Sequence, residues 1–492
     1  MYYQSTRGPE KSAPLDAVLR GIASDGGLFV LPGMGDLSFD WEACLMKSPL
    51  EMAAAILGFF IPDCADMETL VHKAYDGKFD APDLTPLVKA GDRFILELFH
   101  GPTAAFKDVA LSMLPQLITA GRKQTHRKEE TVILTATSGD TGKAALEGFH
   151  DVPGTRIIVF YPNGGVSAVQ RAQMVTQEGA NVKVCAVEGN FDDCQRGVKE
   201  AFAALSDSEE LLRSGFRLSS ANSINIGRLA PQVVYYFIAY AELLKRNEIA
   251  KGDKVDFIVP TGNFGDILAG YYAKLLGLPV GRLVCASNKN NVLTDFLNKG
   301  SYDRRRPFFK TSSPSMDILV SSNLERLLFL MSGEDTETVA ALMKALNEGG
   351  AYEIPAEMLA KIQKEFAAYY CDEENTLKTI GDVYRETCYT ADPHTAVALY
   401  AESLYRKENA AVNKTVVLST ASPFKFPEAV LRGLSEATTE DEFENQEILS
   451  KLTGIPVPKG LSGLREKEVL HKDVIGRNEV VDYVRKQLNL EK

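Results

Sequence analysis

Short apolar runs that alternate with helical patterns are the feature that most constrains the fold of this chain. From Arg93 onward, runs rich in valine and isoleucine are each followed by a segment with helical periodicity. Uninterrupted apolar runs of this kind are typical of parallel strands that are buried on both faces. We therefore predict an α/β fold in which helices wrap parallel sheets. The predicted strands are residues 93–99, 131–137, 156–161, 181–187, 256–259, 283–286 and 415–420.

Changes of pattern along the chain predict a division into units. Residues 1–90 mix short helices and turns, residues 91–434 carry the strand–helix alternation, and residues 435–492 begin strongly polar. We expect the last unit to hold one or two helices that close over the body. Residues 336–375 are helical in pattern and charged, which predicts an inserted lobe. The other predicted helices are residues 14–23, 52–60, 141–149, 166–177, 191–204, 229–245 and 267–276.

The charge balance argues against nucleic acid or an anionic membrane as the main partner. The chain has 492 residues, and its 54 basic and 66 acidic side chains give a net charge of −12. A protein with this balance repels polyanions. The dense basic run at residues 304–306 is short and precedes a proline, so we interpret it as a solvated loop.

The cysteine and histidine residues are too scattered to predict a disulfide framework or a metal site. The seven cysteines form no CxxC pair, and the six histidines form no HExxH motif. Free thiols fit a reducing compartment. The N-terminal segment lacks the apolar stretch of a signal peptide. No run approaches the roughly 20 apolar residues of a membrane span. We therefore expect a cytoplasmic protein without a metal.

The segment HGPTAAFKDVA, residues 100–110, places Lys107 directly after a predicted strand and at the start of a predicted helix. Gly101 and Pro102 mark the turn between the two elements. Loops that leave the carboxyl ends of parallel strands are where α/β proteins bind ligands. Lys107 is therefore a candidate functional amine. The alternative is an ordinary surface lysine in a first helical turn, where its charge would oppose the helix dipole.

The loop TSGDTG, residues 137–142, joins a predicted strand to a predicted helix. Its hydroxyls and the N–H groups of the helix start suit a carboxylate or a phosphate. The sequence GDTGK suggests a P-loop, but Thr137 stands where the first glycine is required and Ala144 where Ser or Thr should follow the lysine. An ATP-dependent kinase is therefore disfavoured. The simpler alternative is a well-capped turn.

Two further loops follow predicted strands. In GNFGD, residues 262–266, the two glycines allow close approach to an anion, and successive N–H groups can converge on a phosphate. Asp266 is awkward at such a site and could instead cap the helix. In STASP, residues 419–423, hydroxyls could contact a ring nitrogen, or could only form the turn before the proline. A lysine, a phosphate cradle and a hydroxyl loop together match the needs of pyridoxal phosphate.

With these loops in its sequence, the chain resembles the threonine synthase family, of the longer bacterial and fungal type. The resemblance extends over most of the chain and implies a fold-type-II pyridoxal-phosphate enzyme of the tryptophan-synthase-β kind, with parallel sheets in two lobes. It also implies that residues 1–90 form an extra N-terminal domain, residues 91–434 the catalytic domain and residues 435–492 an extension. The matching segments are YQSTRG, LRGIASDGGLFV, HGPTAAFKD, TATSGDTGKAA, SANSINIGRLAPQ, PTGNFGD, SPSMDI, SSNLER, DPHTA, STASPFKFPEA and GIPVPKGL.

The resemblance also implies residue roles. Lys107 would form the Schiff base with the cofactor, and Thr420 would contact its pyridine nitrogen. Arg228 offers a planar fork suited to the substrate phosphate, although it could also be a helix-start arginine in a surface ion pair. His394 could support the site or only cap a helix, and we assign it no role. The remaining implied contacts are Gly262, Asn263, Phe264, Gly265 and Asp266 to the cofactor phosphate, Ser138, Asp140 and Thr141 beside the ring and the substrate carboxylate, and Asn225 with Arg228 at the substrate phosphate.

The implied reaction converts O-phospho-L-homoserine and water into L-threonine and phosphate, the last step of threonine biosynthesis. It proceeds by γ-elimination and β-addition of water. The partner is then a small molecule, and we expect a monomer or a weak homodimer. One rival is a phospholyase or hydroxy-amino-acid dehydratase on the same scaffold, which would release a keto acid and ammonia. Another is a catalytically silent binding protein that kept the fold.

Overall fold

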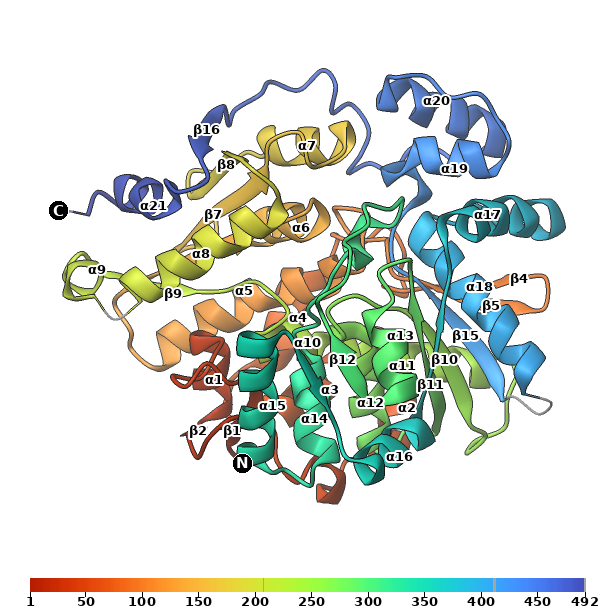
Figure 1. Ribbon diagram of the computed structural model, residues 1–492, viewed down its shortest axis with the longest axis horizontal. Coiled ribbons are helices and arrows are strands. Elements are labelled where there is room, and N and C mark those ends of the chain that lie inside the picture. The colour runs from red at the N-terminus through yellow and green to blue at the C-terminus, as the bar shows by residue number, and fades with distance from the viewer. Residues whose placement is uncertain (207, 410–412, 491–492) are drawn as a thin grey trace.

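Two mostly parallel sheets form the centre of the molecule (Figure 1). A computed structural model describes residues 1–206, 208–409 and 413–490. The six-stranded sheet has the order β14-β11-β10-β15-β5-β4, and the five-stranded sheet the order β16-β8-β7-β6-β9. The strands of the first sheet are β4 (Leu87–Ala90), β5 (Arg93–Glu97), β10 (Val255–Pro260), β11 (Val280–Ser287), β14 (Phe366–Tyr370) and β15 (Lys414–Ser419). Those of the second are β6 (Glu130–Ala136), β7 (Thr155–Pro162), β8 (Val182–Glu188), β9 (Phe216–Ser219) and β16 (Asp473–Gly476).

Alternate residues of the six-stranded sheet point into different cores. Ile258 and Val417 pack in one cluster with apolar side chains of α18 (Pro393–Glu408). Their neighbours Phe257 and Val416 belong to the main core on the other face. This burial on both faces explains the uninterrupted apolar runs from which the strands were predicted. The helices that pack on the main-core face include α11 (Val233–Lys245) and α12 (Gly265–Leu275).

The five-stranded sheet is covered in the same way. Val132 and Leu134 of β6 pack in a separate cluster with α8 and α21, whereas Ile133 faces the main core. In Figure 1 this sheet lies at the upper left and the six-stranded sheet at the right, with α5 between them. Helices of this part are α5 (Lys107–Gln124), α6 (Asp140–Phe149), α7 (Ala168–Val175), α8 (Phe191–Leu205), α9 (Glu209–Arg213) and α21 (Val480–Leu488).

Two predicted helical stretches are more broken than the sequence pattern indicated. The helix expected at residues 229–245 is divided, because a 3₁₀ turn that contains Pro231 separates one short helix from α11. The lobe expected at residues 336–375 contains an edge strand of the six-stranded sheet, β14, between two helices. The elements here are α10 (Ile226–Leu229), η2 (Ala230–Gln232), α13 (Val292–Lys299), β12 (Ser301–Asp303), η3 (Pro314–Met316), α14 (Leu324–Met331), α15 (Thr336–Gly349), β13 (Ala351–Glu353), α16 (Ala356–Glu365) and α17 (Glu373–Thr387).

The N-terminal segment forms a small antiparallel sheet with helices around it. It is tied to the body by Arg7, whose guanidinium pairs with Glu325 at 2.7 Å. The boundary predicted at residue 90 falls inside a hairpin, because β4 pairs antiparallel with β5. The elements are β1 (Tyr3–Ser5), β2 (Lys11–Ser12), α1 (Pro14–Arg20), β3 (Phe29–Val30), η1 (Met34–Asp36), α2 (Trp41–Leu45), α3 (Pro49–Phe60) and α4 (Met67–Tyr75).

The C-terminal segment crosses the molecule from one sheet to the other. It begins beside η4 (Pro423–Lys425), where Gln446 of α20 donates to the carbonyl of Phe424 at 2.7 Å. It ends at β16, which pairs in parallel with β8 and was not predicted. Its helices are α19 (Pro427–Gly433), α20 (Glu442–Thr453) and α21, and the last two lie within residues 435–492, where one or two helices were predicted. All seven cysteines are free thiols. Among the described residues, no helix is long and apolar enough to cross a lipid bilayer.

Candidate active site

Lys107 is the first residue of α5, as predicted, and its amine is buried. The preceding loop is held to the end of β15, because Leu98 N–H donates to Ser419 O at 2.9 Å and Phe106 N–H to Thr420 O at 2.9 Å. Only 7% of Lys107 is exposed. Burial lowers the pKa of this amine to about 8, against the opposing effect of Asp140. An amine with this pKa is partly uncharged near neutral pH, which a nucleophile requires.

The GNFGD loop presents unbonded N–H groups on one side. Ser321 Oγ donates to Gly262 O at 2.8 Å, and Asn323 donates from its side chain and backbone to Asn263 O. These bonds fix the carbonyls. Among the described residues, none accepts a hydrogen bond from the N–H of Gly262, Asn263, Phe264, Gly265 or Asp266. A helix start with free donors of this kind is suited to a phosphate.

The shape of this loop depends on its glycines and on Phe264. A Cβ at Gly262 would lie 2.8 Å from the carbonyl oxygen of Ser315, so a side chain there would push the two loops apart. Phe264 has a left-handed backbone with φ of 62° and is held there by its buried ring, which packs against Phe366 at 5.7 Å. Such a conformation in a residue with a side chain is costly and persists only where packing enforces it.

Asp266 lies inside the first turn of α12 and does not cap it. Its Oδ1 accepts hydrogen bonds from the hydroxyls of Tyr235 at 2.5 Å and Tyr236 at 3.0 Å. Burial raises the pKa of Asp266 to about 7, although these hydroxyls and Lys107 oppose the rise. Its Oδ2 is buried, and no described residue hydrogen-bonds to it. An ionised Asp266 would repel a phosphate bound at this loop. A partly protonated carboxyl repels it less.

Asp140, expected beside the substrate carboxylate, faces lysines. Its Oδ2 lies 3.5 Å from Nζ of Lys107, and its Oδ1 lies 2.8 Å from Nζ of Lys425. Gln170 also donates to Oδ1 at 3.0 Å. Both oxygens therefore contact groups of the protein, and the expected position of Asp140 beside the ring and the substrate carboxylate stays a prediction. Ser138 and Thr141 remain half-buried at the loop surface, available to a ligand.

Ser315 connects the lysine to the phosphate loop. Its Oγ lies 3.3 Å from Nζ of Lys107 and donates to Asp140 Oδ2 at 2.9 Å. Its carbonyl oxygen is the atom that leaves no room for a side chain at Gly262. The amine and the cradle therefore lie on two sides of one residue. Sequence reasoning missed Ser315, Ser321, Asn323 and Lys425, although all lie in segments that carried the resemblance.

Of the predicted pair at the substrate phosphate, Asn225 bonds to the protein with its whole amide, whereas Arg228 donates from Nη1 to Ala221 O at 2.6 Å and pairs with no carboxylate among the described residues. Asn225 caps α10, and both of its amide hydrogens are used by Val18 O at 3.0 Å and Ser220 O at 3.3 Å. Arg228 is 6% exposed and has no carboxylate partner among the described residues. Burial lowers its pKa to about 10, so it remains a cation. Arg228 is therefore the remaining candidate for binding the substrate phosphate, and it forms no surface ion pair.

Thr420 has the free hydroxyl of its loop. Ser419 Oγ pairs with Thr395 Oγ1 at 2.8 Å, and Ser422 Oγ accepts from Phe424 N–H at 3.3 Å. No hydrogen bond joins the Thr420 hydroxyl to another described residue, although the side chain is largely buried. It is therefore available to a ring nitrogen.

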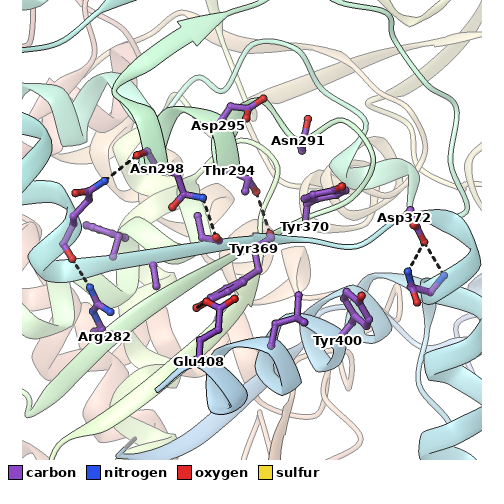
Figure 2. Close-up of a pocket in the computed structure, with 16 residues that line it drawn as sticks. Arg282, Asn291, Thr294, Asp295, Asn298, Tyr369, Tyr370, Asp372, Tyr400 and Glu408 are labelled. Atoms are coloured by element: carbon purple, nitrogen blue, oxygen red, sulfur yellow. Dashed lines mark hydrogen bonds between the residues drawn. The ribbon is translucent and has the colours of Figure 1, made fainter. Parts of the chain in front are cut away.

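A cavity of about 620 Å³ lies elsewhere, along the edge strand β14 (Figure 2). Several of its polar groups form hydrogen bonds within the protein. Thr294 donates to Tyr369 O at 3.1 Å, Asn298 to Ala368 O at 3.2 Å, and Arg282 to Gln363 O at 2.5 Å. No metal-binding group of His, Cys, Asp or Glu occurs within the described parts of the chain. The site around Lys107, by contrast, has a buried amine and N–H groups that bond to no carbonyl among the described residues.

The unused groups fit pyridoxal phosphate. The buried amine, the free N–H groups of the GNFGD loop and the Thr420 hydroxyl correspond to its carbonyl, phosphate and ring nitrogen. Residues 79–421 match the family described as pyridoxal-phosphate dependent enzyme. Residues 2–75 match the threonine synthase N terminus, and residues 395–481 the threonine synthase C-terminal family.

Curated proteins and solved structures agree with these matches. The chain is 40% identical over 459 residues to a threonine synthase of Pseudomonas aeruginosa, covering 91% of this chain and 94% of that protein. It is 39% identical over 436 residues to human threonine synthase-like 1, covering 85% of this chain but only 58% of the human protein. A crystal structure of pyridoxal-phosphate-bound threonine synthase from Brucella melitensis superposes with a TM-score of 0.86 at 38% identity, covering 99% of this chain and 98% of that one.

Proposed function

This chain belongs to the threonine synthase family of pyridoxal-phosphate-dependent enzymes, and we propose that it converts O-phospho-L-homoserine and water into L-threonine and phosphate. The observation that carries the proposal is the buried Lys107 amine, joined through Ser315 to a loop of unbonded N–H groups. Lys107 would hold the cofactor carbonyl, residues 262–266 its phosphate, and Thr420 its ring nitrogen. When bound, pyridoxal phosphate supplies an electron sink for charge that develops next to the substrate nitrogen.

Lys107 is the catalytic base of this proposal. With a pKa of about 8, roughly a tenth of the amine is uncharged at neutral pH. We assign to it the removal of the proton from the substrate Cα. Burial excludes bulk water from this amine, so a proton that it takes stays within the site. The Thr420 hydroxyl can donate or accept, so unlike a carboxylate it does not hold a proton on its partner nitrogen.

Arg228 binds the substrate phosphate in this proposal. A buried guanidinium without an acidic partner favours a dianion, and its planar fork can donate twice. Its Nη2 lies 3.5 Å from Thr141 Oγ1, which brings the predicted hydroxyl loop beside the same anion. Asn225 contributes indirectly, by fixing the start of the short helix that carries Arg228.

The experiment compares the purified protein with Lys107→Ala and with Lys123→Ala, an exposed lysine on the same helix. We expect the wild type and Lys123→Ala to show the cofactor absorption band and to release phosphate and threonine from phosphohomoserine. Lys107→Ala should lose both the band and the product. Release of a keto acid and ammonia in place of threonine would contradict the proposed reaction and favour the dehydratase. Colourless wild-type protein would favour a silent binding protein.

We further propose that the chain acts on the small molecule phosphohomoserine and has no nucleic-acid or membrane partner. We also propose that it acts in the cytoplasm as a monomer or weak homodimer. The free thiols support a reducing compartment. Light scattering at two protein concentrations tests the assembly, because a weak dimer dissociates on dilution whereas a stable oligomer does not.

A further inference from the structure

A second lysine lies in the buried part of the site, and the proposed reaction gives it no role. Lys425 ends η4 and is fully buried. Its Nζ donates to Asp140 Oδ1 at 2.8 Å and to the carbonyl oxygen of Thr103 at 3.0 Å. Because Asp140 Oδ2 faces Nζ of Lys107 at 3.5 Å, one carboxylate stands between two lysines.

The two lysines share this carboxylate unequally. The contact with Lys425 has the length of a charge-assisted hydrogen bond, whereas the contact with Lys107 is longer than such bonds usually are. Burial alone would raise the pKa of Asp140, but Lys425 and Lys107 hold it well below its ordinary value. The carboxylate is therefore ionised, and its stronger interaction is with Lys425.

Two cations near Lys107 disfavour a positive charge on its amine. Arg228 and Lys425 both disfavour the charged form of its amine, and Asp140 is the ionised carboxylate that opposes them. Asp266 opposes them weakly, because burial raises its pKa to about 7. Six titratable groups face Lys107 or its carboxylate partner. Asp108 lies on the same helix as Lys107, and each of the others comes from a different element. They are Asp108, Asp140, Arg228, Asp266, His394 and Lys425.

We propose that Lys425 is a positioning residue that keeps the Lys107 amine out of a tight ion pair and so available in its uncharged form. It does so by neutralising Asp140 and by adding a second positive charge to the pocket. The use of that amine in catalysis rests on the proposed function. The charge state of the amine is a property of the protein itself and can be measured without substrate.

The test is a pH titration of the Lys107 amine in the cofactor-free protein, followed by NMR of side-chain ¹⁵N-lysine. The signal is identified by its loss in Lys107→Arg. In Lys425→Met, Asp140 is free to pair with Lys107, so the titration midpoint should rise by about one unit or more. Near neutral pH this is an approximately tenfold loss of uncharged amine. Lys425→Arg keeps a cation against Asp140 and should restore a low midpoint.

Two further variants keep the test decisive. Lys425→Met removes the nearest cation from a buried carboxylate, which can prevent folding, so the same substitution is also made in an Asp140→Asn background. There the midpoint should still rise, because one repulsive charge is removed. Lys143→Met is the matched control: Lys143 is a buried lysine on the same helix as Asp140, but it pairs with Glu147 at 2.9 Å. It should leave the midpoint unchanged.

A midpoint that does not rise in either background would overturn the role of Lys425. That outcome differs from failure of the proposed function. If the midpoint moves as expected but the wild-type holoenzyme makes no threonine from phosphohomoserine, the inference about Lys425 stands and the proposed reaction fails. If threonine is made and the midpoint is unmoved, the reaction stands and the inference fails.

Discussion

The backbone N–H of Ser315 donates to Nε2 of His394 at 3.2 Å. Because Nε2 accepts this bond, the ring proton lies on Nδ1, which faces Asp392 Oδ2 at 2.7 Å. Asp392 also caps α18 through the backbone of His394. The cap of this helix is therefore Asp392, and His394 has the other role that the sequence left open: it supports the site, because it holds the residue that touches Lys107.

His394→Phe should test this support. Phenylalanine can keep the contact that the ring makes with Phe426 but accepts no hydrogen bond, so the half-buried N–H of Ser315 loses its partner at a cost of about 1 kcal/mol. We expect a lower melting temperature and a threonine-forming kcat reduced by about tenfold. His72→Phe, at an exposed histidine, is the control. Equal kcat in both variants would show that His394 does not support the site.

Arg228→Lys should separate charge from geometry at the substrate phosphate. A lysine keeps the positive charge but loses the planar fork, so KM for phosphohomoserine should rise by about tenfold while kcat changes less. Inhibition by inorganic phosphate should weaken in parallel. The exposed Arg217 on β9, changed in the same way, should alter neither quantity. Unweakened phosphate inhibition would place the anion elsewhere.

Asp266 should make the protein less stable as the pH rises. Its pKa is about 7 in the folded protein and near 4 when unfolded, so between these values the folded state binds the extra proton. Stability is then greatest below about pH 4 and falls until about pH 7, by at most about 4 kcal/mol. Asp266→Asn should remove this component. Urea unfolding at pH 5 and pH 8 measures it, and the same pH difference in both proteins would contradict the assignment.

Gly460 tests the contact between the C-terminal segment and the loop before Lys107. A Cβ there would collide with the carbonyl oxygen of Pro102, so Gly460→Ala must displace one of the two segments. Overpacking of this kind costs about 1–3 kcal/mol. We expect a lower melting temperature and faster loss of the cofactor absorption band on dialysis. Gly58 of α3 has open space around it, and Gly58→Ala should be neutral or slightly stabilising.

Local sequence signals predicted where Lys107 and the loops lie, because a turn before a helix start determines the positions of Lys107 and GNFGD. They could not predict Lys425, whose meaning depends on Asp140, a residue far away in the chain. Asn225 shows the same limit, since an asparagine before a short helix can bind a ligand or cap the helix, and only the positions of Val18 and Ser220 decide.

The edge strands were missed for a related reason. FAAYY of β14 and DVIG of β16 are short, and their pairing is determined by the open side of a neighbouring strand. Nothing in such segments distinguishes a strand from a loop until the rest of the sheet is present. The central strands, buried on both faces, were predicted because their apolar runs carry the information locally.

The position of β16 has a consequence for biosynthesis. It pairs with β8 but comes much later in the chain, so the outer hydrogen-bonding groups of β8 stay open on the nascent polypeptide until β16 has left the ribosome. At roughly 5–20 residues per second, that interval is on the order of tens of seconds. An exposed strand edge can recruit other chains. A truncation that removes the last twenty or so residues would make this temporary hazard permanent, and we expect such a product to accumulate in aggregates.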